Sequence, residues 1–321
     1  MVRLRKNKMS FSQEIKKELM DNIATARHCQ IAELAALLCL CGKMVVDKSG
    51  RIHIKLQTEN CYVAKKFFLL VKKVLSIKTE IIVRAGQAGG KHLQYHLFLR
   101  REDAVKRVLE ATKLQPVCNG QETVLFTNPL VIQNTCCKRA YLRGAFLCIG
   151  SVTNPEKAYH FELVAQDVKK AELLRSCIAA FDIDAKCIER KGYQVVYVKE
   201  GSQVVDLLNV MEAHVALMNF ENVRIVKDVR NDVNRKVNCE AANINKTVQA
   251  ARKQIEDILL IQSRAGLEQL PEGLEEIARL RMEYPEASLK ELGEMLTPPM
   301  GKSGVNHRLK KIGEYAERFR E

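Results

Sequence analysis

The 321-residue sequence has no tryptophan and no uninterrupted run of the roughly 18 apolar residues that a membrane-spanning helix needs. A basic N-terminus is followed at residues 11–20 by the spacing of an amphipathic helix, where a signal peptide would carry an apolar stretch. We therefore expect a cytoplasmic protein without a membrane span. Hydrophobic residues make up 47% and charged residues 28% of the chain, which is typical of a folded globular protein.

The sequence has eleven cysteines but no CxxC pair, and the number is odd. Several of them lie inside apolar stretches, among them Cys39, Cys41 and Cys148. Because disulfide frameworks and zinc sites need regular spacings, the pattern favours buried free thiols in a reducing compartment. The sequence thus predicts no metal ligands and no cofactor.

Acidic residues are fewer than basic ones: the chain has 38 Asp and Glu and 52 Lys and Arg, which gives a net charge of +14. Residues 1–234 hold 37 basic and 24 acidic residues, a net of +13, and residues 235–321 hold 15 and 14, a net of +1. An excess of this size favours a polyanionic partner, meaning nucleic acid or an anionic membrane surface. Solubility through excess charge is the alternative interpretation.

An internal repeat with an offset of about 108 residues organises the first two thirds of the chain. Near-continuous apolar helices are predicted at 31–41 and 139–149, each ending at a glycine. Strand and helix patterns then follow in the same order twice, at 43–47, 51–58, 60–75, 79–84, 92–100 and 102–112, and again near 152 and at 158–165, 168–181, 185–190, 193–199 and 202–213. The pattern predicts an α+β fold, a tandem αββαββα repeat with pseudo-two-fold symmetry.

The last third of the chain reads as helical. Residues 217–246 are rich in Asn and Arg with little periodicity, and a long helix is predicted at 247–261. Three short helices follow at 272–283, 288–296 and 303–319, separated by prolines. We expect four segments: an N-terminal helical extension at 1–30, the two-repeat domain at 31–216, a connecting segment with the long helix at 217–270, and an all-α domain at 271–321.

The two repeated helices resemble the motif of the LAGLIDADG homing endonucleases, closely at residues 34–42 and more loosely at 142–150. Small side chains at Ala36 and Gly144 predict close packing of the helices. The nuclease needs an acidic residue before the last glycine of each motif to hold a divalent metal, and Cys41 and Ile149 occupy these positions. Cleavage is therefore not expected unless carboxylates are recruited from elsewhere; candidates are Glu33 and Asp47.

The strand at 51–58 alternates, with Ile52, Ile54 and Leu56 predicted to face the core. In the nuclease fold the sheets form a saddle over DNA, and the predicted solvent face of this strand and of the one at 92–100 supplies a candidate saddle: Arg51, His53, Lys55, Gln57, His92, His96 and Arg100. The second repeat has Glu162 in place of Lys55. A merely solvated face, or one that binds a protein, remains open.

The helices at 288–296 and 303–319 have the pattern of a helix-turn-helix. Ser288 is an N-cap, Gly293 lies where the helices approach, and Val305, Leu309 and Ile312 point inward on the second helix. The candidate DNA-binding residues are Ser288, Lys290, Lys302, Ser303, Asn306, His307, Arg308, Lys310 and Lys311.

Of these, Asn306 has the chemistry to pair with adenine, and Arg308 with guanine or phosphate. The five-residue turn 297–301 is longer than the usual turn of ~3–4 residues, and a solvated basic helix is the alternative.

Segments at 10–12, 138–146, 234–243 and 303–309 resemble the WhiA family, and the resemblance spans essentially the whole chain from Met9. It implies a bacterial protein with a degenerate LAGLIDADG domain and a C-terminal helix-turn-helix, without nuclease activity. It also implies a sequence-specific, nucleoid-associated transcription regulator involved in cell division, chromosome segregation or sporulation.

The implied partner is double-stranded DNA, with a second transcription regulator or a cell-division protein as a further candidate. A protein-binding scaffold and an endonuclease are the competing hypotheses. The target sequence, the oligomeric state and the choice between Met1 and Met9 as the start stay open.

Overall fold

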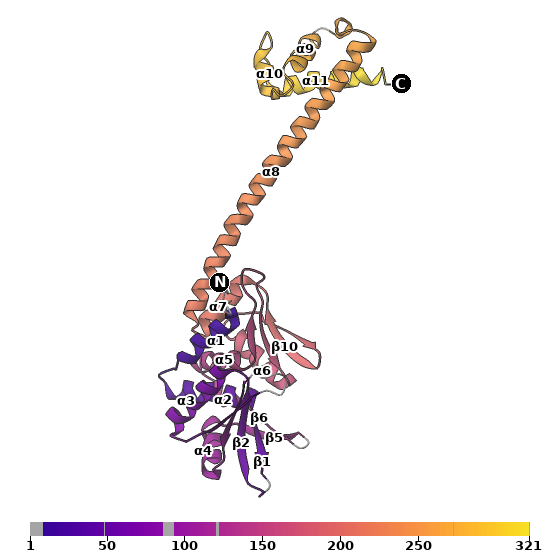
Figure 1. Ribbon diagram of the computed structural model, residues 1–321. Coiled ribbons are helices and arrows are strands. Elements are labelled where there is room, and N and C mark those ends of the chain that lie inside the picture. Colours follow the sequence, from indigo (N-terminus) through magenta and orange to yellow (C-terminus); the bar gives the residue numbers. More distant parts are fainter. Residues whose placement is uncertain (1–8, 48, 86–92, 120–121, 272, 321) are drawn as a thin grey trace, which may run out of the picture. The chain divides into compact units, whose positions relative to one another are not determined.

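The computed structural model describes residues 9–47, 49–85, 93–119, 122–271 and 273–320 (Figure 1). The chain divides into two units, residues 1–227 and 228–321. The N-terminal extension belongs to the first unit, and the division falls after residue 227, where the sequence suggested breaks at 216 and 270. The basic segment 1–8 lies outside the described residues.

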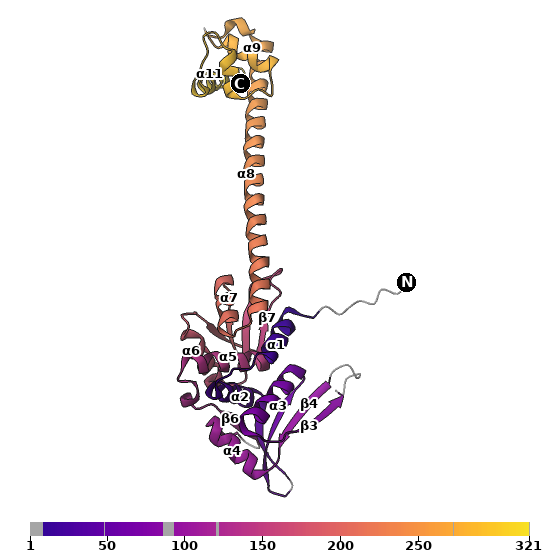
Figure 2. The ribbon, with the colours of Figure 1, turned by 90° about the vertical axis from the view of Figure 1, so that its left-hand side faces the viewer.

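The first unit is built on two central helices, α2 (Arg27–Cys41) and α5 (Thr135–Ile149). They pack against each other, as both views of the ribbon show (Figures 1 and 2). A β-carbon placed at Gly144 would lie 2.8 Å from the Glu33 carbonyl oxygen and 2.9 Å from the Ala36 β-carbon. The close packing predicted from Ala36 and Gly144 is confirmed.

Each repeat contributes one antiparallel sheet. The strands of the first are β1 (Gly42–Val46), β2 (Ile52–Thr58), β3 (Glu80–Ala85), β4 (Leu93–Leu99), β5 (Gln115–Asn119) and β6 (Glu122–Phe126), in the order β3-β4-β2-β1-β6-β5. Those of the second are β7 (Gly150–Val152), β8 (Phe161–Ala165), β9 (Lys186–Arg190) and β10 (Tyr193–Val198), in the order β7-β8-β10-β9. The orders β1-β2-β4-β3 and β7-β8-β10-β9 correspond, so the α+β tandem repeat is confirmed. The β5–β6 pair was not predicted.

Helices cover one face of each sheet and leave the other face open. Besides α2 and α5, they include α1 (Phe11–Asp21), α3 (Cys61–Leu75), α4 (Glu102–Thr112) and α6 (Val168–Ala179). The unit also contains α7 (Gly201–Val210) and a short 3₁₀ turn, η1 (Pro129–Ile132), which packs against α2 and α5. The Ser10 side chain accepts the Gln13 N–H at the start of α1, as an N-cap does. Alternate strand residues such as Leu56, Leu97 and Leu163 are fully buried under the helices. The opposite face of each sheet is therefore available to a partner.

A buried ionic network ties these helices together. The Glu33 carboxylate lies 3.0 Å from Lys66 Nζ and 3.3 Å from Arg143 Nε, and none of the three side chains is more than 2% exposed. Arg143 also pairs with Glu212 at 2.6 Å, just before the helix that leaves the unit. Burial raises the pKa of Glu33 although Lys66 and Arg143 act to lower it. The cluster thus connects Glu33 and Lys66 of the first repeat to Arg143 of the second and, through Arg143, to Glu212, which lies just before the next helix of the chain.

That helix, α8 (His214–Arg264), is 51 residues long. The Asn- and Arg-rich stretch 217–246, in which the sequence showed little periodicity, is helical throughout, so the long helix predicted at 247–261 begins much earlier in the chain. Neither glycine nor proline occurs between His214 and Arg264, so nothing interrupts the backbone hydrogen bonds. The helix ends before Gly266, which adopts a positive φ of 82°.

The second unit joins the end of α8 to a small helical core. Its other elements are η2 (Leu267–Gln269), α9 (Glu275–Glu283), α10 (Leu289–Met295) and α11 (Lys302–Glu317). Ile258, Ile277, Leu292 and Leu309 are among the residues that bury their side chains there. Within the part of the chain that the structure describes, no helix is both long and apolar enough to cross a membrane.

Candidate nucleic-acid interface

The turn between α10 and α11 holds the two helices in a fixed relation. A capping box starts α10, in which the Ser288 side chain accepts the Glu291 N–H and the Glu291 side chain accepts the Ser288 N–H. The Met300 N–H donates to the Gly293 carbonyl at 2.8 Å, and a β-carbon at Gly293 would lie 2.1 Å from the Met300 carbonyl oxygen. The close approach expected at Gly293 is confirmed, and the longer turn 297–301 folds back onto α10.

The α11 helix has one buried face and one exposed face. Val305, Leu309 and Ile312 are buried, as predicted. The side chains opposite them are exposed: Ser303, His307, Lys310, Lys311 and Glu314. Lys310 Nζ lies 3.8 Å from Glu314 Oε1, a surface pair of small energy that a phosphate can replace. Lys302 is exposed at the first turn of the helix.

Arg308 does not lie on the exposed face, so that part of the prediction was wrong. Its side chain is half-buried and Nη1 donates to the Gly273 carbonyl at 3.0 Å. Two other candidates also have internal partners: Ser288 caps α10, and Lys290 lies 3.8 Å from Glu294. The sequence could not show this for Arg308, because Gly273 is 35 residues away along the chain.

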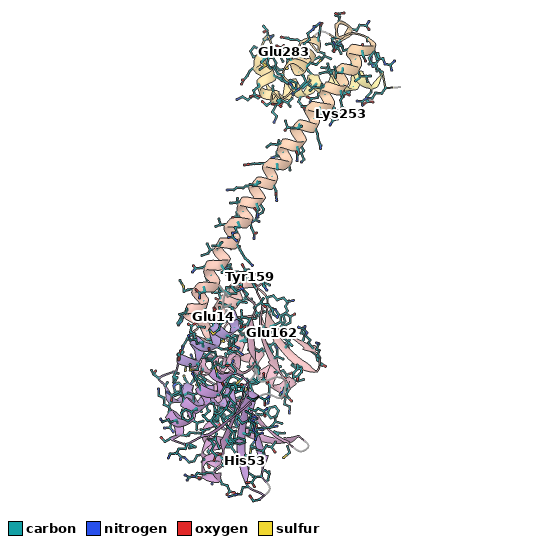
Figure 3. All side chains as sticks on the ribbon, viewed as in Figure 1. Glu14, His53, Tyr159, Glu162, Lys253 and Glu283 are labelled. Carbon is teal, nitrogen blue, oxygen red and sulfur yellow. The ribbon has the colours of Figure 1, made fainter. Side chains whose placement is uncertain are left out.

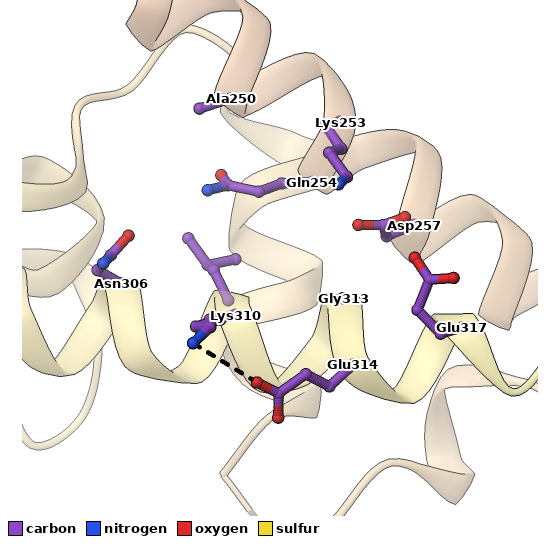
Figure 4. A pocket seen from close by; sticks show the side chains of 10 residues that line it. Ala250, Lys253, Gln254, Asp257, Asn306, Lys310, Gly313, Glu314 and Glu317 are labelled. Atoms are coloured by element: carbon purple, nitrogen blue, oxygen red, sulfur yellow. Dashed lines mark ion pairs between the residues drawn. The ribbon is translucent and has the colours of Figure 1, made fainter.

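A groove runs between α8 and α11 within the second unit (Figure 4). Asn306 and Lys310 line it from α11, and Lys253, Gln254 and Asp257 line it from α8 (Figure 4). Burial raises the pKa of Asp257, although its pairing with Arg320 opposes the shift. Asn306 therefore lies on the flank of α11 that faces α8, while His307 occupies the outward position.

The open face of the first sheet carries a row of basic and aromatic groups. Lys55 on β2 lies opposite Lys43 on β1 and opposite Phe98 on β4. The Arg100 guanidinium lies 4.7 Å from the centre of the Phe98 ring and its Nε lies 2.6 Å from Glu80. Gln57 is exposed two residues beyond Lys55 on the same face. This sheet face matches the chemistry of a phosphate-binding surface.

The second sheet repeats this arrangement with a different charge. Glu162 lies on β8 of the second sheet (Figure 3). It pairs with Ser151 and Tyr197 and so occupies the position of Lys55, as the sequence predicted. Lys199 lies 5.2 Å from the centre of the Tyr197 ring, an arrangement like that of Arg100 over Phe98. His160 pairs its ring with Tyr197 at 5.9 Å, the counterpart of His53 and Phe98 at 6.0 Å. The internal repeat was the sequence signal that could have identified Tyr197 and Lys199.

Two histidines of the predicted saddle are buried, which corrects that prediction. His53 is 8% and His96 is 6% exposed, because each lies on a middle strand with neighbours on both sides. Burial lowers the pKa of His96, and the nearby charges of Lys55 and Arg84 lower it further. The imidazole is therefore neutral at pH 7 and supplies no charge to a phosphate.

Two positions near the start of β2 also differ from the simple alternating pattern. Ile52 was expected in the core but is 43% exposed, because it lies at the start of β2. Arg51 precedes the strand and lies 3.5 Å from Asp47 in the preceding turn. His92 lies outside the described residues.

The position of the nuclease metal centre has a different chemistry here. Cys41 and Ile149 end the two motif helices, and the buried Lys16 lies near Cys41 and Cys148. Burial lowers the pKa of Lys16, while the two thiols act to raise it. Glu33, one carboxylate considered for recruitment, is fully buried between two cations. Asp47, the other, accepts hydrogen bonds from Ser49 and Arg51, which lower its pKa.

Comparison with known proteins gives consistent matches along the chain. Three family models match: the WhiA N-terminal LAGLIDADG-like domain at residues 27–115, the WhiA LAGLIDADG-like domain at 138–230 and the WhiA C-terminal HTH domain at 233–316. The chain is 56% identical over 314 residues to the probable cell division protein WhiA of Lachnoclostridium phytofermentans, covering 98% of this chain and 100% of that protein.

A second relative and a solved structure are similar to the chain over nearly its whole length, and both are also named WhiA. The probable cell division protein WhiA of Alkaliphilus oremlandii is 49% identical over 315 residues, covering 98% of each chain. The crystal structure of full-length WhiA from Thermatoga maritima is similar with a TM-score of 0.58 and 28% identity, covering 97% of this chain and 99% of that one.

Proposed function

Because this chain belongs to the WhiA family, we propose that it is a non-enzymatic, sequence-specific DNA-binding protein that regulates transcription in the course of cell division. The observation that carries the proposal is the exposed face of α11, held by the tight Gly293–Met300 turn. The names of the relatives support the cell-division role. DNA binding of this kind places the protein on the nucleoid.

In this proposal the helix-turn-helix reads sequence. The first turns of a recognition helix meet base edges in the major groove while flanking lysines meet phosphates. His307 is the outward residue of α11, with Lys310 and Lys311 beside it for phosphates. Asn306 lies on the flank of α11 that faces α8, so in this proposal it contacts bases from the side of the recognition helix and His307 contacts them from its outward face. Arg308 acts by fixing the position of α11 through its hydrogen bond to Gly273.

The sheet faces of the first unit add affinity without sequence information. The first 234 residues hold nearly all the excess positive charge of the chain. Lys43, Lys55 and Arg84 contribute to it on the open face of the first sheet. Phosphate contacts release counterions, so their contribution falls steeply as the salt concentration rises.

The proposal also assigns no nuclease activity. A magnesium site needs oxygen ligands, and the two positions that carry them in the homing-endonuclease motif are a thiol and an alkyl side chain, Cys41 and Ile149. Glu33 is held by Lys66 and Arg143 and has no solvent access. Supercoiled plasmid incubated with the protein and Mg²⁺ should stay intact, and nicked product that grows with protein concentration would contradict this part of the proposal.

A salt titration of duplex binding tests the central claim. We expect Lys310→Ala with Lys311→Ala to weaken binding to all duplexes, and to reduce the slope of log K against log[salt] by about 1.8, or about 0.9 for each phosphate that is no longer neutralised. His307→Ala should reduce discrimination between a selected site and random duplex, with little change in the slope. The matched control is Lys246→Ala, an exposed lysine on α8. If the double variant binds as tightly as the control variant, α11 is not the DNA-binding helix.

A further inference from the structure

Two pairs of residues from opposite repeats converge where α2 and α5 begin. His28 and Cys29 lie in the first turn of α2, and Cys136 and Cys137 lie in the first turn of α5. His28 Nδ1 lies 3.3 Å from Cys29 Sγ, 3.9 Å from Cys136 Sγ and 3.2 Å from Cys137 Sγ. All four donor atoms lie within 4.8 Å of one another. In the described ranges no other group of three or more such ligands gathers in this way.

These separations are close to those of a tetrahedral metal site. With a zinc–sulfur distance of about 2.3 Å and a zinc–nitrogen distance of about 2.0–2.1 Å, tetrahedral geometry places nitrogen and sulfur about 3.5 Å apart and two sulfurs about 3.8 Å apart. The three distances from His28 Nδ1 fall on both sides of that nitrogen–sulfur value. Because all four donor atoms lie within 4.8 Å of one another, side-chain rotations that move them by up to about 1 Å would complete the coordination shell.

The internal repeat explains how four ligands meet without a CxxC motif. Leu34 and Leu142 begin the two nine-residue motifs within α2 and α5, an offset of 108 residues. The same offset relates Cys29 to Cys137 and His28 to Cys136. The pseudo-two-fold axis between α2 and α5 therefore brings two adjacent pairs together. Cys29 and Cys137 are buried on the inner side of the cluster, and His28 and Cys136 are exposed on its outer side.

We propose that His28, Cys29, Cys136 and Cys137 bind one Zn²⁺ ion on the pseudo-two-fold axis. Three cysteines and one histidine are a ligand set of structural zinc sites, and four protein ligands leave no position open for a substrate. The exposed pair gives the ion access from solvent. This prediction is independent of the proposed DNA-binding function.

The two helix ends favour the charge of such a centre. Three thiolates, one neutral imidazole and Zn²⁺ carry a net charge of −1, which is stabilised at a helix N-terminus by the unpaired N–H groups and the helix dipole. Both α2 and α5 begin here, and neither has a side-chain hydrogen bond at its N-cap residue, Ala26 or Asn134. The N-terminal ends of both helices thus face the cluster without side-chain caps.

The site lies at the end of the helix pair opposite to the position of the nuclease metals. Cys41 is twelve residues beyond Cys29 on α2, which at about 1.5 Å per residue is about 18 Å along the helix. A zinc ion bound at the N-terminal ends of α2 and α5 would join the two repeats at one end of their shared axis. Its role is structural, because it fixes α2 to α5.

Metal analysis of the full-length chain tests the proposal. Protein purified under reducing conditions from zinc-supplemented medium should contain about one zinc per chain by elemental mass spectrometry. Co²⁺ added to the metal-free chain should give the visible d–d bands and the thiolate charge-transfer band of tetrahedral coordination. Cys136→Ser and His28→Ala change exposed residues and leave the core intact, and each should reduce zinc content and the charge-transfer band. The control Cys239→Ser, an exposed thiol on α8, should retain both.

Thermal unfolding separates a bound structural ion from surface contamination. A strong zinc chelator should lower the melting temperature of the wild type by roughly 5–10 °C and leave that of Cys136→Ser nearly unchanged. The proposal is overturned if the wild type holds less than about 0.1 zinc per chain and gives no cobalt thiolate band. A disulfide between the two repeats in the reduced, zinc-supplemented preparation, or zinc content equal in all variants, would overturn it as well.

Discussion

The contact between the two central helices gives the sharpest stability prediction. Gly144→Ala adds one methyl group to α5, where that carbon would lie 2.9 Å from the Ala36 β-carbon and 2.8 Å from the Glu33 carbonyl oxygen. Carbon atoms in contact normally lie about 3.5–4.0 Å apart, so the shortfall is at least about 0.6 Å. The carbonyl belongs to a helix backbone and cannot rotate away. The helices must therefore separate.

The magnitude follows from two opposing effects. Overpacking of a closely packed core costs about 1–3 kcal/mol, and the double contact at Gly144 places it near the upper value. Replacing glycine by alanine inside a helix returns about 1 kcal/mol of helix propensity. We expect a net loss of about 2 kcal/mol, or a fall in melting temperature of about 4–8 °C for a unit of this size.

Hydrogen exchange of peptides from α2 and α5, measured in increasing urea, isolates the affected unit from the rest of the chain. The matched test is a double-mutant cycle with Ala36→Gly, which removes one of the two close approaches. The loss in free energy of unfolding caused by Ala36→Gly should be smaller by about 1 kcal/mol in the Gly144→Ala background than in the wild type. A Gly144→Ala chain as stable as the wild type would refute the packing argument.

Three further predictions concern other parts of the molecule. Gly293→Ala places a β-carbon 2.1 Å from the Met300 carbonyl oxygen, so hydrogen-exchange protection in the second unit should fall by about 3 kcal/mol while the first unit is unaffected; retained protection would contradict this geometry. Glu162→Lys should steepen the salt dependence of duplex binding by about 0.9 in log K per log[salt], measured by fluorescence anisotropy, and an unchanged slope would mean that the second sheet does not contact phosphates. Burial acts to raise the pKa of Glu212, but Arg143 and Asn22 outweigh it, so this pKa is below its ordinary value of 4.5. The stability that Glu212 contributes is thus present above about pH 4.5 and is lost as pH falls through the lowered pKa. The urea midpoints of the wild type and of Glu212→Gln should therefore differ at pH 7 and converge in acid. A difference in urea midpoint that stays constant with pH would argue against the ion pair.

The sequence indicated much of the candidate interface because its signals are local. The buried positions Ile54 and Leu56 of β2, the inward stripe of α11 and the N-cap at Ser288 each belong to patterns of residues a few positions apart. Such patterns are fixed by the repeat of a strand or a helix, so they can be read without knowing the fold. In α8, by contrast, periodicity indicated only the part at 247–261, although the absence of glycine and proline permits the continuous helix that forms.

The burial of a side chain that is surrounded by segments distant in the chain could not be predicted from the sequence. His53 and His96 follow the pattern of a solvent face, yet neighbouring strands bury both of them. Arg308 follows the pattern of an exposed basic helix, yet it donates to Gly273. Burial and hydrogen-bond partners depend on which elements pack together, and local periodicity does not encode that choice.

By itself, the amino-acid sequence determined the tandem repeat, the helix-turn-helix and the replacement of the acidic residues by Cys41 and Ile149. Only the tertiary structure decided which of the basic residues face outward and which cysteines come together. His28 and Cys136 are 108 residues apart, and they meet because two helices related by the repeat pack side by side. A linear spacing rule does not find such ligands, since the pseudo-two-fold axis, and not the chain, makes them neighbours.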